Sequence, residues 1–348
     1  MILAGDIGGT KTLLALSSVS ESRVLWQQRY DSTVVTNFSE LLTHFLSQAQ
    51  QVLASQMPQG LPAIAAAGFG IAGPISGALG AQQVKATNLP WVLDSAEISV
   101  QLGGIPVVFA NDLVASGTAA IFAPAPAKVA LNPFARVPAR ALNGTSSGHV
   151  AVIAAGTGLG EALFYFDGTR HHPMPTEGGH CDFAPNNALE NELWAYLRAK
   201  LDGHVSYERI LCGKGFVELY EFAKTQALAS ETPHMQARLS TCQDKSAVIT
   251  AQAVAGSDAL SEIACRLFAR IYGAEAGNLA LKSLPMGGVF VAGAIAGHIL
   301  PFMQREFMQG FLDKGRFTDL LRQIPVWVVS DPDLALKGAT QLARTQLV

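Results

Sequence analysis

The sequence predicts an α/β protein built from two related halves. Residues 1–16 and residues 150–166 share one layout, in which a strand, a turn rich in Gly and Thr, and a second strand follow one another. Apolar runs at 63–69 and 105–110 lie between helical segments, which is typical of strands in a sheet covered on both faces. The 348 residues are enough for about two domains with their own cores.

The first half opens with three predicted strands and a helix. The strands lie at 2–5, 13–18 and 24–30, where β-branched and aromatic residues are frequent. Asn37 is expected to cap a helix that runs to about residue 56, because apolar residues recur there at helical spacing. A βββα unit results, and the strands at 63–69 and 105–110 follow it.

The second half starts with the repeated layout and continues with helices. Asp167-Gly168 is a hairpin signal, and residues 123–148, rich in Ala, Pro, Asn, Gly and Ser, predict a surface excursion near the junction. The remaining expected elements are helices between 189 and 284, including a long one at 259–281, a Gly-rich strand exit at 287–293, a strand at 326–329 and a C-terminal helix.

Composition argues against nucleic acid and membrane partners. The chain holds 49% hydrophobic and 15% charged residues, with 24 Lys+Arg against 27 Asp+Glu and no basic runs. Residues 61–81 are uncharged and long enough to span a membrane, but Pro62, Pro74 and several glycines interrupt them. A buried strand followed by turns is therefore expected there.

Cysteine usage and the N-terminus indicate a cytoplasmic location. None of the four cysteines (Cys181, Cys212, Cys242 and Cys265) belongs to a C-x-x-C pair, so the sequence suggests neither a disulfide framework nor a zinc ribbon. Asp6 stands where a signal peptide would need its apolar core.

Two Gly/Thr turns are candidate phosphate sites. In residues 6–10, Gly8 and Gly9 let backbone N–H groups approach a phosphate closely, Thr10 adds a donor, and Asp6 can face a metal or its water shell. An ordinary Gly hairpin is the alternative. A second such turn, Gly156-Thr157-Gly158-Leu159-Gly160, occupies the equivalent place in the other half and favours the phosphate interpretation. Neither turn has the spacing of a Walker A loop.

A third Gly-rich segment, at 68–73, matches G-x-G-x-x-G after a strand, as in nicotinamide dehydrogenases. That motif must open a helix, and Pro74, Gly77 and Gly80 would disrupt it. The dinucleotide interpretation is therefore rejected.

Two polar groups are candidates for acid–base chemistry and hydroxyl recognition. Asp112 follows the strand at 105–110, where a carboxylate is well placed as a general base, although a helix N-cap would use the same residue type. Glu177, His180 and Glu208 suit vicinal sugar hydroxyls, because carboxylates accept two hydrogen bonds and a neutral His both donates and accepts. A helix-start charge for Glu208 and a satisfied buried His180 remain alternatives, as does a metal site among His171, His172, Glu177, His180, Cys181 and Asp182.

Taken together, these motifs resemble those of the bacterial ATP-dependent glucokinase family, within the hexokinase–actin superfamily. The resemblance covers essentially the whole chain, and the run at 177–186 is highly specific. The motifs are DIGGT at 6–10, TNLPW at 87–91, FANDL at 109–113, GTGLG at 156–160, EGGHCDFAPN at 177–186, GHVSYER at 203–209, GGVFVAG at 287–293 and DKGRF at 313–317.

The resemblance implies a specific architecture. Family members have two α/β domains of duplicated βββαβαβα type, the ribonuclease H-like or actin-like ATPase fold, around a hinged cleft. Residues 1–122 with 331–348 would form a small domain, since the last helix returns to it. Residues 123–330 would form a large domain with helical insertions.

The resemblance also implies a reaction, the transfer of the γ-phosphoryl group of Mg-ATP to the 6-hydroxyl of glucose. Asp112 would be the catalytic base, and magnesium would accompany ATP near Asp6. A homodimer is a family-level expectation. The sugar would be bound by Asn88, Asn111, Asp112, Glu177, His180 and Glu208. ATP would be held by Asp6, Gly8, Gly9, Thr10, Gly156, Thr157, Gly158 and Gly293.

Two departures from the family pattern bear on nucleotide selectivity. Lys11 stands where many of these glucokinases carry Asn, and Ala294 replaces a second glycine of the adenosine motif. Two other functions stay open, a kinase of the same fold for another hexose and a catalytically silent sugar-sensing protein.

Overall fold

The computed structural model describes residues 1–20, 23–55, 57, 61–87, 89–123, 127–135 and 147–347. The chain divides into two compact units. Unit 1 comprises Met1–Ala120 and Pro332–Val348, and unit 2 comprises Ile121–Asp331. Asn88 and much of the expected excursion at 123–148 lie outside the described residues.

Unit 1 is built on a five-stranded mixed sheet with the order β3-β2-β1-β4-β8. Its strands are β1 (Ile2–Ile7), β2 (Lys11–Ser17), β3 (Val24–Asp31), β4 (Ala66–Ile71) and β8 (Val107–Asn111). A small second sheet contains β5 (Ile75–Ser76), β6 (Gln83–Lys85) and β7 (Val92–Asp94). The helical segments are η1 (Ser32–Val34), α1 (Phe38–Ala54), α2 (Ser95–Gln101), α3 (Asp112–Phe122), α14 (Leu334–Arg344) and η7 (Thr345–Leu347).

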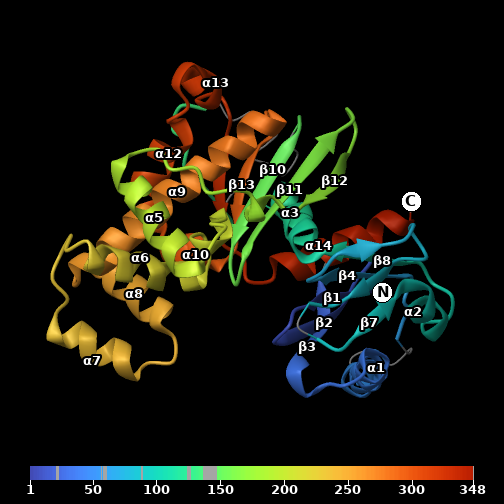
Figure 1. The fold of residues 1–348 in the computed structure, drawn as a ribbon. Coiled ribbons are helices and arrows are strands. Elements are labelled where there is room, and N and C mark those ends of the chain that lie inside the picture. Colours follow the sequence, from blue (N-terminus) through green and yellow to red (C-terminus); the bar gives the residue numbers. More distant parts are fainter. Residues whose placement is uncertain are drawn as a thin grey trace. The chain divides into compact units, whose positions relative to one another are not determined.

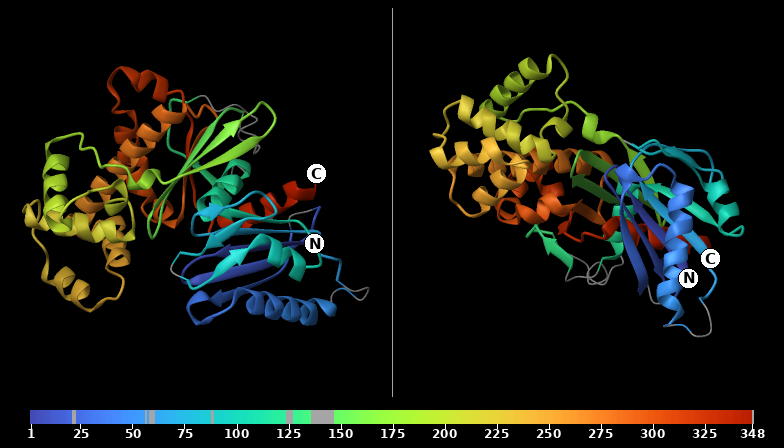
Figure 2. Two further views of the ribbon diagram at one scale, coloured as in Figure 1. Left: turned by 45° about the vertical axis from the view of Figure 1, so that its right-hand side comes forward. Right: turned by 90° about the horizontal axis from the view of Figure 1, so that it is seen from below.

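The alternation of side chains along β1 directs two different helices to the two faces of this sheet. Leu3 and Ile7 belong to the same buried cluster as the apolar stripe of α1, whereas Ala4 packs with residues of α14. Figure 2 shows α1 and α14 on opposite faces of the unit 1 sheet. The side chain of Asn37 caps α1 as predicted, since it accepts hydrogen bonds from Ser39 N and Glu40 N.

Close packing of α14 on β4 explains the Gly-rich pattern at 68–73. A Cβ added at Gly68 would overlap the Ala339 carbonyl oxygen of α14, and one at Gly70 would lie 3.0 Å from Ala115 Cβ of α3. No helix follows β4, which leads instead through a turn into β5. The absence of a helix after β4 confirms that this motif is not a dinucleotide site. Its glycines instead let helices pack closely against the strand.

Unit 2 repeats the strand order of unit 1. Its six-stranded sheet has the order β12-β11-β10-β13-β14-β9. The strands are β9 (Lys128–Ala130), β10 (Val150–Ala155), β11 (Leu159–Phe166), β12 (His171–Thr176), β13 (Gly288–Ala292) and β14 (Val326–Val329). In both units a central strand pairs antiparallel with the next strand and parallel with the one after the intervening helices.

The helices of unit 2 gather mainly beside one face of its sheet (Figure 1). Val289 and Val291 of β13 join the large cluster formed with these helices, while Phe290 stacks on Trp327 at the other face. The long α9 begins at the Asp258 cap and ends at Leu284, which adopts a left-handed conformation. The principal helices are α5 (Ala188–Leu201), α6 (Gly213–Thr225), α7 (Pro233–Thr241), α8 (Lys245–Val254) and α9 (Ala259–Ser283). The shorter segments are η3 (Gly178–His180), η4 (Tyr207–Arg209), α10 (Ala294–His298), α11 (Leu300–Phe302), η5 (Met303–Phe307), α12 (Met308–Leu312), η6 (Gly315–Phe317) and α13 (Thr318–Leu321).

The predicted α/β class, the repeated layout and the hairpin at Asp167-Gly168 are confirmed. The excursion at 123–148 needs a correction, because its described part contains β9, which pairs antiparallel with β14 as the edge of the sheet. Lys128 lies over the Phe290 and Trp327 rings there, contacts that the local composition does not reveal. Within the described ranges, no helix combines the length and apolar character that a membrane span requires.

We expect Gly68→Ala to destabilise the protein by about 1–3 kcal/mol, because the new methyl group must push α14 away from β4. Equilibrium unfolding in urea measures this loss. Val52→Ala, at an exposed position of α1, is the control and should change stability by less than about 0.5 kcal/mol. A Gly68→Ala protein as stable as its parent would contradict the tight packing.

Candidate active site

The first Gly/Thr turn lies at the carboxyl edge of the unit 1 sheet. Strands β1, β4 and β8 are parallel, and their register aligns Asp6 with Gly70 and Ile71 with Asn111. Carboxyl ends of parallel strands are where α/β sheets build ligand sites. The turn from β1 to β2 therefore opens at the same edge as the exit of β8.

Backbone hydrogen bonds shape this first turn. Gly8 N donates to Lys11 O over 2.9 Å, and Ser32 N donates to Thr10 O over 3.1 Å. Thr10 and Lys11 are exposed, and Gly8 and Gly9 are partly so. The turn is thus held by its backbone while its outer surface stays accessible to an anion.

Asp6 stands at the base of the turn in an acidic environment. Burial raises the pKa of this half-buried carboxyl above its usual range, and the carboxylates of Asp112 and Asp333 raise it further. Lys11 and Arg29 act in the opposite direction. Asp333, just before α14, was not anticipated, because nothing in its sequence neighbourhood connects it with Asp6.

Asn111 and Asp112 occupy the junction between β8 and α3. Both side chains accept a hydrogen bond from Leu113 N, at 3.0 Å from Asn111 Oδ1 and 2.9 Å from Asp112 Oδ1. Asp112 is the first residue of α3 and is half-buried. Its carboxylate therefore lies in the first turn of a helix, which stabilises negative charge.

The second Gly/Thr turn, at 156–158 in unit 2, is held by two neighbouring segments. Gly156 N donates to Gly158 O over 2.8 Å, and Gly213 N at the start of α6 donates to Gly156 O over 2.8 Å. Leu159 N donates to Glu208 Oε2 over 3.0 Å. The turn is therefore fixed by a helix N-terminus on one side and by a carboxylate on the other.

A pocket of about 360 Å³ opens beside the second turn. Thr157 lines it together with the start of α6, α8 and α10. This volume falls within the range of small-molecule sites, and the N-terminus of α6 with Lys214 offers positive charge to an anion. The lining residues are Thr157, Gly213, Lys214, Phe216, Asp244, Ser246, Ala247, Thr250, Ile295 and His298.

Most of these lining residues were missed by sequence reasoning. Lys214 carries the one local signal of an anion site, since it follows a glycine at the start of a helix. The other lining residues come mainly from helices far apart in the chain, so no local pattern connects them. Gly293 was anticipated, and it caps α10 with φ +92°, a conformation that favours glycine. A Cβ there would lie 3.1 Å from the Ala155 carbonyl oxygen.

The anticipated polar residues of unit 2 come together around two short helical turns. His180 Nδ1 of η3 lies 3.8 Å from Glu208 Oε1 of η4. Tyr207 N donates to Cys181 O over 3.1 Å, which ties the two turns together. Glu177 precedes η3 and makes no capping hydrogen bond with its side chain. Glu177 and His180 are exposed and Glu208 is half-buried, so all three present polar groups to solvent.

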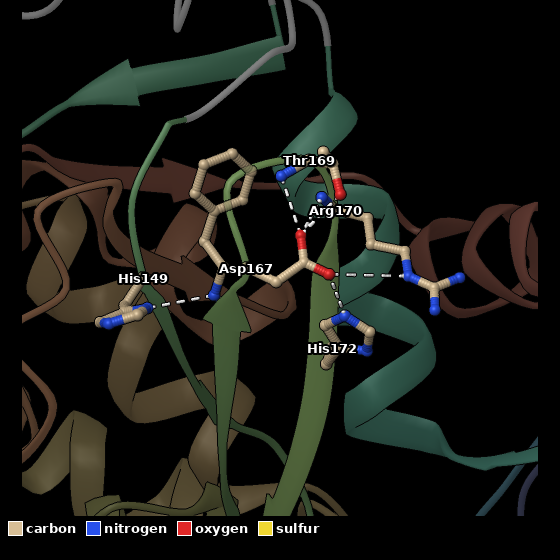
Figure 3. A network of polar contacts seen from close by, with 6 residues as sticks. His149, Asp167, Thr169, Arg170 and His172 are labelled. Atoms are coloured by element: carbon tan, nitrogen blue, oxygen red, sulfur yellow. Dashed lines mark hydrogen bonds and ion pairs between the residues drawn. The ribbon is translucent and has the colours of Figure 1, made fainter.

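Two of the three histidines considered as metal ligands, His171 and His172, are engaged elsewhere. His172 Nε2 lies 2.6 Å from Asp167 Oδ2, and His171 Nε2 lies 3.0 Å from Gly148 O. Figure 3 shows Asp167 organising the β11–β12 hairpin, with the backbone N–H groups of Thr169 and Arg170 also pointing at its carboxylate. Across the part of the chain that the structure describes, no three His, Cys, Asp or Glu side chains gather as a metal site.

Comparison with known proteins gives a consistent result along the whole chain. A family model described as Glucokinase matches residues 3–346. The glucokinase of a Nostoc species is 38% identical over 355 residues, covering 99% of this chain and 98% of that protein. Among solved structures, a glucokinase from an Antarctic psychrotroph aligns with TM-score 0.78 at 24% identity, covering 99% of this chain and 98% of that one. A ROK family glucokinase from Streptomyces griseus, in complex with glucose and AMPPNP, aligns with TM-score 0.61 at 21% identity, covering 99% of both chains.

We expect the pKa of Asp6 to fall when Asp112 is replaced by Asn, because a like charge that disfavours ionisation is removed. Carboxyl-carbon NMR titration of the two proteins measures the shift. Asp319→Asn, at an exposed position of α13, is the control and should leave the titration of Asp6 unchanged. An unaltered Asp6 titration in the Asp112 variant would contradict the proximity of the two carboxylates.

Proposed function

The chain belongs to the glucokinase family, and on that premise we propose that it transfers the γ-phosphoryl group of ATP to the 6-hydroxyl of glucose, with Asp112 as the general base. The observation that carries this proposal is the pairing of two Gly/Thr turns at equivalent sheet edges with a pocket beside the second turn. Such turns suit the phosphates of a nucleotide, and the pocket suits its nucleoside.

We assign the nucleoside of ATP to the pocket of unit 2 and its phosphates to the two Gly/Thr turns. Backbone N–H groups at Gly156, Thr157 and Gly158 would bind its phosphates, with the N-terminus of α6 close by through the Gly213–Gly156 hydrogen bond. Gly8, Gly9 and Thr10 would contribute in the same manner from the first turn. Gly293 would approach the adenosine. The Streptomyces griseus glucokinase, whose fold is shared, binds the ATP analogue AMPPNP together with glucose.

Magnesium fits the acidic edge of unit 1. Mg²⁺ bound to nucleotides takes one or two protein carboxylates and completes its shell with phosphate oxygens and water. Asp6, with Asp112 and Asp333 raising its pKa, is a carboxyl group whose charged form a cation would stabilise. When bound, the ion would offset negative charge on the phosphates.

Glucose would be recognised by carboxylates, amides and an imidazole. Glu177, His180 and Glu208 would hydrogen-bond hydroxyls other than the one that reacts, and Asn111 would act with them. Glu208 would have two roles. It would bind the sugar, and it also accepts a hydrogen bond from Leu159 N, which links the proposed sugar residues with the second Gly/Thr turn. Asn88, which lies outside the described residues, is proposed beside them.

Asp112 would remove the proton of the 6-hydroxyl as that oxygen attacks the γ-phosphorus. The helix N-terminus beneath it favours the carboxylate form that a base requires. Positioning and charge stabilisation account for most of the catalysis of phosphoryl transfer, so the backbone donors of the two turns are as important as the base.

A hexose panel tests the substrate. ADP release with Mg-ATP is measured with glucose, fructose, mannose, N-acetylglucosamine or no sugar. Turnover that is highest with glucose supports the proposal. Turnover on another hexose would replace glucose and keep the nucleotide assignment, whereas no turnover with any sugar would favour a sugar-sensing protein.

We expect Asp112→Asn to lower kcat by about 10²–10⁴-fold while glucose binding is retained, because the amide cannot accept the proton yet keeps the size and polarity of the side chain. Coupled kinetics and calorimetry measure the two quantities. Asp94→Asn, at the N-cap of α2, controls for loss of a carboxylate. Near-normal turnover of the Asp112 variant would remove this residue from the mechanism.

We expect Glu177→Gln to weaken glucose binding by roughly 1.5–3 kcal/mol, the contribution of hydrogen bonds to a charged group. Calorimetric titration with glucose measures the dissociation constant. Glu192→Gln, at an exposed position of α5, is a matched control. A dissociation constant equal to that of the parent would defeat the assignment of Glu177 to the sugar.

A further inference from the structure

Two carboxyl groups lie buried side by side beneath the polar turns of unit 2. Glu161 of β11 is 2% exposed, and Glu275 of α9 is fully buried. Glu161 directly follows the Gly-rich run at 156–160, but neither residue belongs to the sugar or nucleotide set proposed above. Buried carboxyl groups are costly unless they are paired or neutral, so this pair requires an explanation.

The surroundings of the pair favour a proton held between the two carboxyl groups. Glu275 Oε2 accepts from Asn278 Nδ2 over 2.8 Å. Glu161 Oε1 and Glu275 Oε1 are buried, and neither has an amide or hydroxyl donor among the described residues. The two carboxyl groups are within hydrogen-bonding range of each other. Because two carboxylates only accept, a bond between them needs one proton.

The pair contacts both segments that carry the proposed sugar residues. A Cβ added at Gly178, next to Glu177, would overlap Glu161 Oε2, so the backbone of η3 rests directly on this carboxyl group. Thr176 Oγ1 donates to Glu161 O over 2.9 Å and accepts from Gly178 N over 3.2 Å. The start of η3 is thus anchored to Glu161 through both its backbone and its side chain.

The second contact runs through Tyr207, the neighbour of Glu208. Asn278 Nδ2 lies 3.0 Å from the Tyr207 hydroxyl, and that hydroxyl also hydrogen-bonds Glu275. Tyr207 is 2% exposed, so its ring cannot move independently of the core. A change in the charge of the pair therefore reaches η3 through Glu161 and η4 through Glu275.

We propose that Glu161 and Glu275 are positioning residues that share one proton, and that this proton holds η3 and η4 in the geometry that binds the sugar. Loss of the proton places two negative charges in one buried site, where their repulsion separates the carboxyl groups and displaces Gly178 and Tyr207. This inference rests on the proposed function, since it states that the shared proton controls the affinity for the sugar.

The charges that face the pair leave the shared proton bound at neutral pH. Burial and the neighbouring Glu275 raise the pKa of Glu161 to about 8, and burial raises the pKa of Glu275 as well. Lys282 of α9 favours the charged form of both carboxyl groups, and Lys314 before η6 also lies near Glu275. Tyr207 and Tyr272 face the pair with hydroxyl groups whose pKa is raised by burial, so they stay neutral.

The test compares glucose affinity across pH in the wild-type protein and in Glu161→Gln. The glutamine amide donates permanently to Glu275, so it replaces the shared proton with a hydrogen that does not titrate. Calorimetry from pH 6.5 to 9.5 should show the wild-type dissociation constant rising about tenfold between pH 7 and 9, as expected for a required proton lost near pH 8. In Glu161→Gln this rise should shrink to less than about twofold.

The reciprocal variant Glu275→Gln should flatten the profile in the same way. Glu262→Gln, on a part-exposed position of the same helix, should keep the wild-type profile. Titrating groups outside the pair contribute equally to every protein, so the difference between profiles isolates the pair. In steady-state kinetics, raising the pH should increase KM for glucose more than it changes kcat, because the pair does not touch the reacting atoms.

A second readout needs no sugar. Because the folded pKa of Glu161 is raised from 4.5 to about 8, the folded state keeps a proton that the unfolded chain releases, and wild-type stability falls as the pH rises through this interval. The unfolding temperature of Glu161→Gln relative to wild type should therefore increase from pH 5 to pH 8. A difference independent of pH would overturn the shared proton.

The outcomes separate the two proposals. Parallel affinity profiles in wild type and Glu161→Gln, with glucose bound by both, would overturn the positioning inference alone. Absence of glucose binding by the wild-type protein at every pH would overturn both the proposed function and the inference that rests on it.

Discussion

Parallel strand pairing at the centre of each sheet is the constraint on which the rest of the structure depends. In unit 1, β1 pairs parallel with β4, and β4 with β8; in unit 2, β10 pairs parallel with β13, and β13 with β14. Their carboxyl ends must then meet at one edge. Since β1 and β10 also turn into antiparallel partners, the Gly/Thr turns open at these same edges. One pairing rule thus brings a turn, a strand exit and a helix N-terminus together in each unit.

Glycine serves two distinct physical purposes here, and only context separates them. At Gly156 a Cβ would meet open space, so glycine leaves the turn accessible, whereas at Gly68 glycine lets a helix backbone lie against a strand. Helix–helix contacts use the same device, since a Cβ at Gly273 would overlap the Phe307 carbonyl oxygen and one at Gly310 that of Arg270. A glycine motif therefore predicts close approach of something to the backbone. Whether that is a phosphate or another segment depends on the element that follows.

Features set by neighbouring residues could be predicted from the sequence, and features set by distant ones could not. Hydrophobic periodicity and the Asn37 cap placed α1 within a few residues, and the Asp167-Gly168 signal identified the β11–β12 hairpin. The strand β9 was missed because its stability comes from pairing with β14, almost two hundred residues away in the numbering. The pocket was missed for the same reason, since α6, α8 and α10 assemble it. Motifs indicated Glu177, His180 and Glu208, but Glu161 and Glu275 carry no local signal.

The charges at the two sheet edges follow one principle with opposite consequences for pH. Burial disfavours the charged form of Asp6 in unit 1 and of Glu161 in unit 2, and a neighbouring carboxylate raises the pKa of each further. If Asp6 holds magnesium as proposed, it must be ionised, so acid would weaken the nucleotide site. If a shared proton positions the sugar site as proposed, the glutamate pair must keep that proton, so alkali would weaken sugar binding. Under these two proposals the same desolvation would limit the reaction from both sides, and nucleotide and sugar would be bound together in the interval between the two titrations.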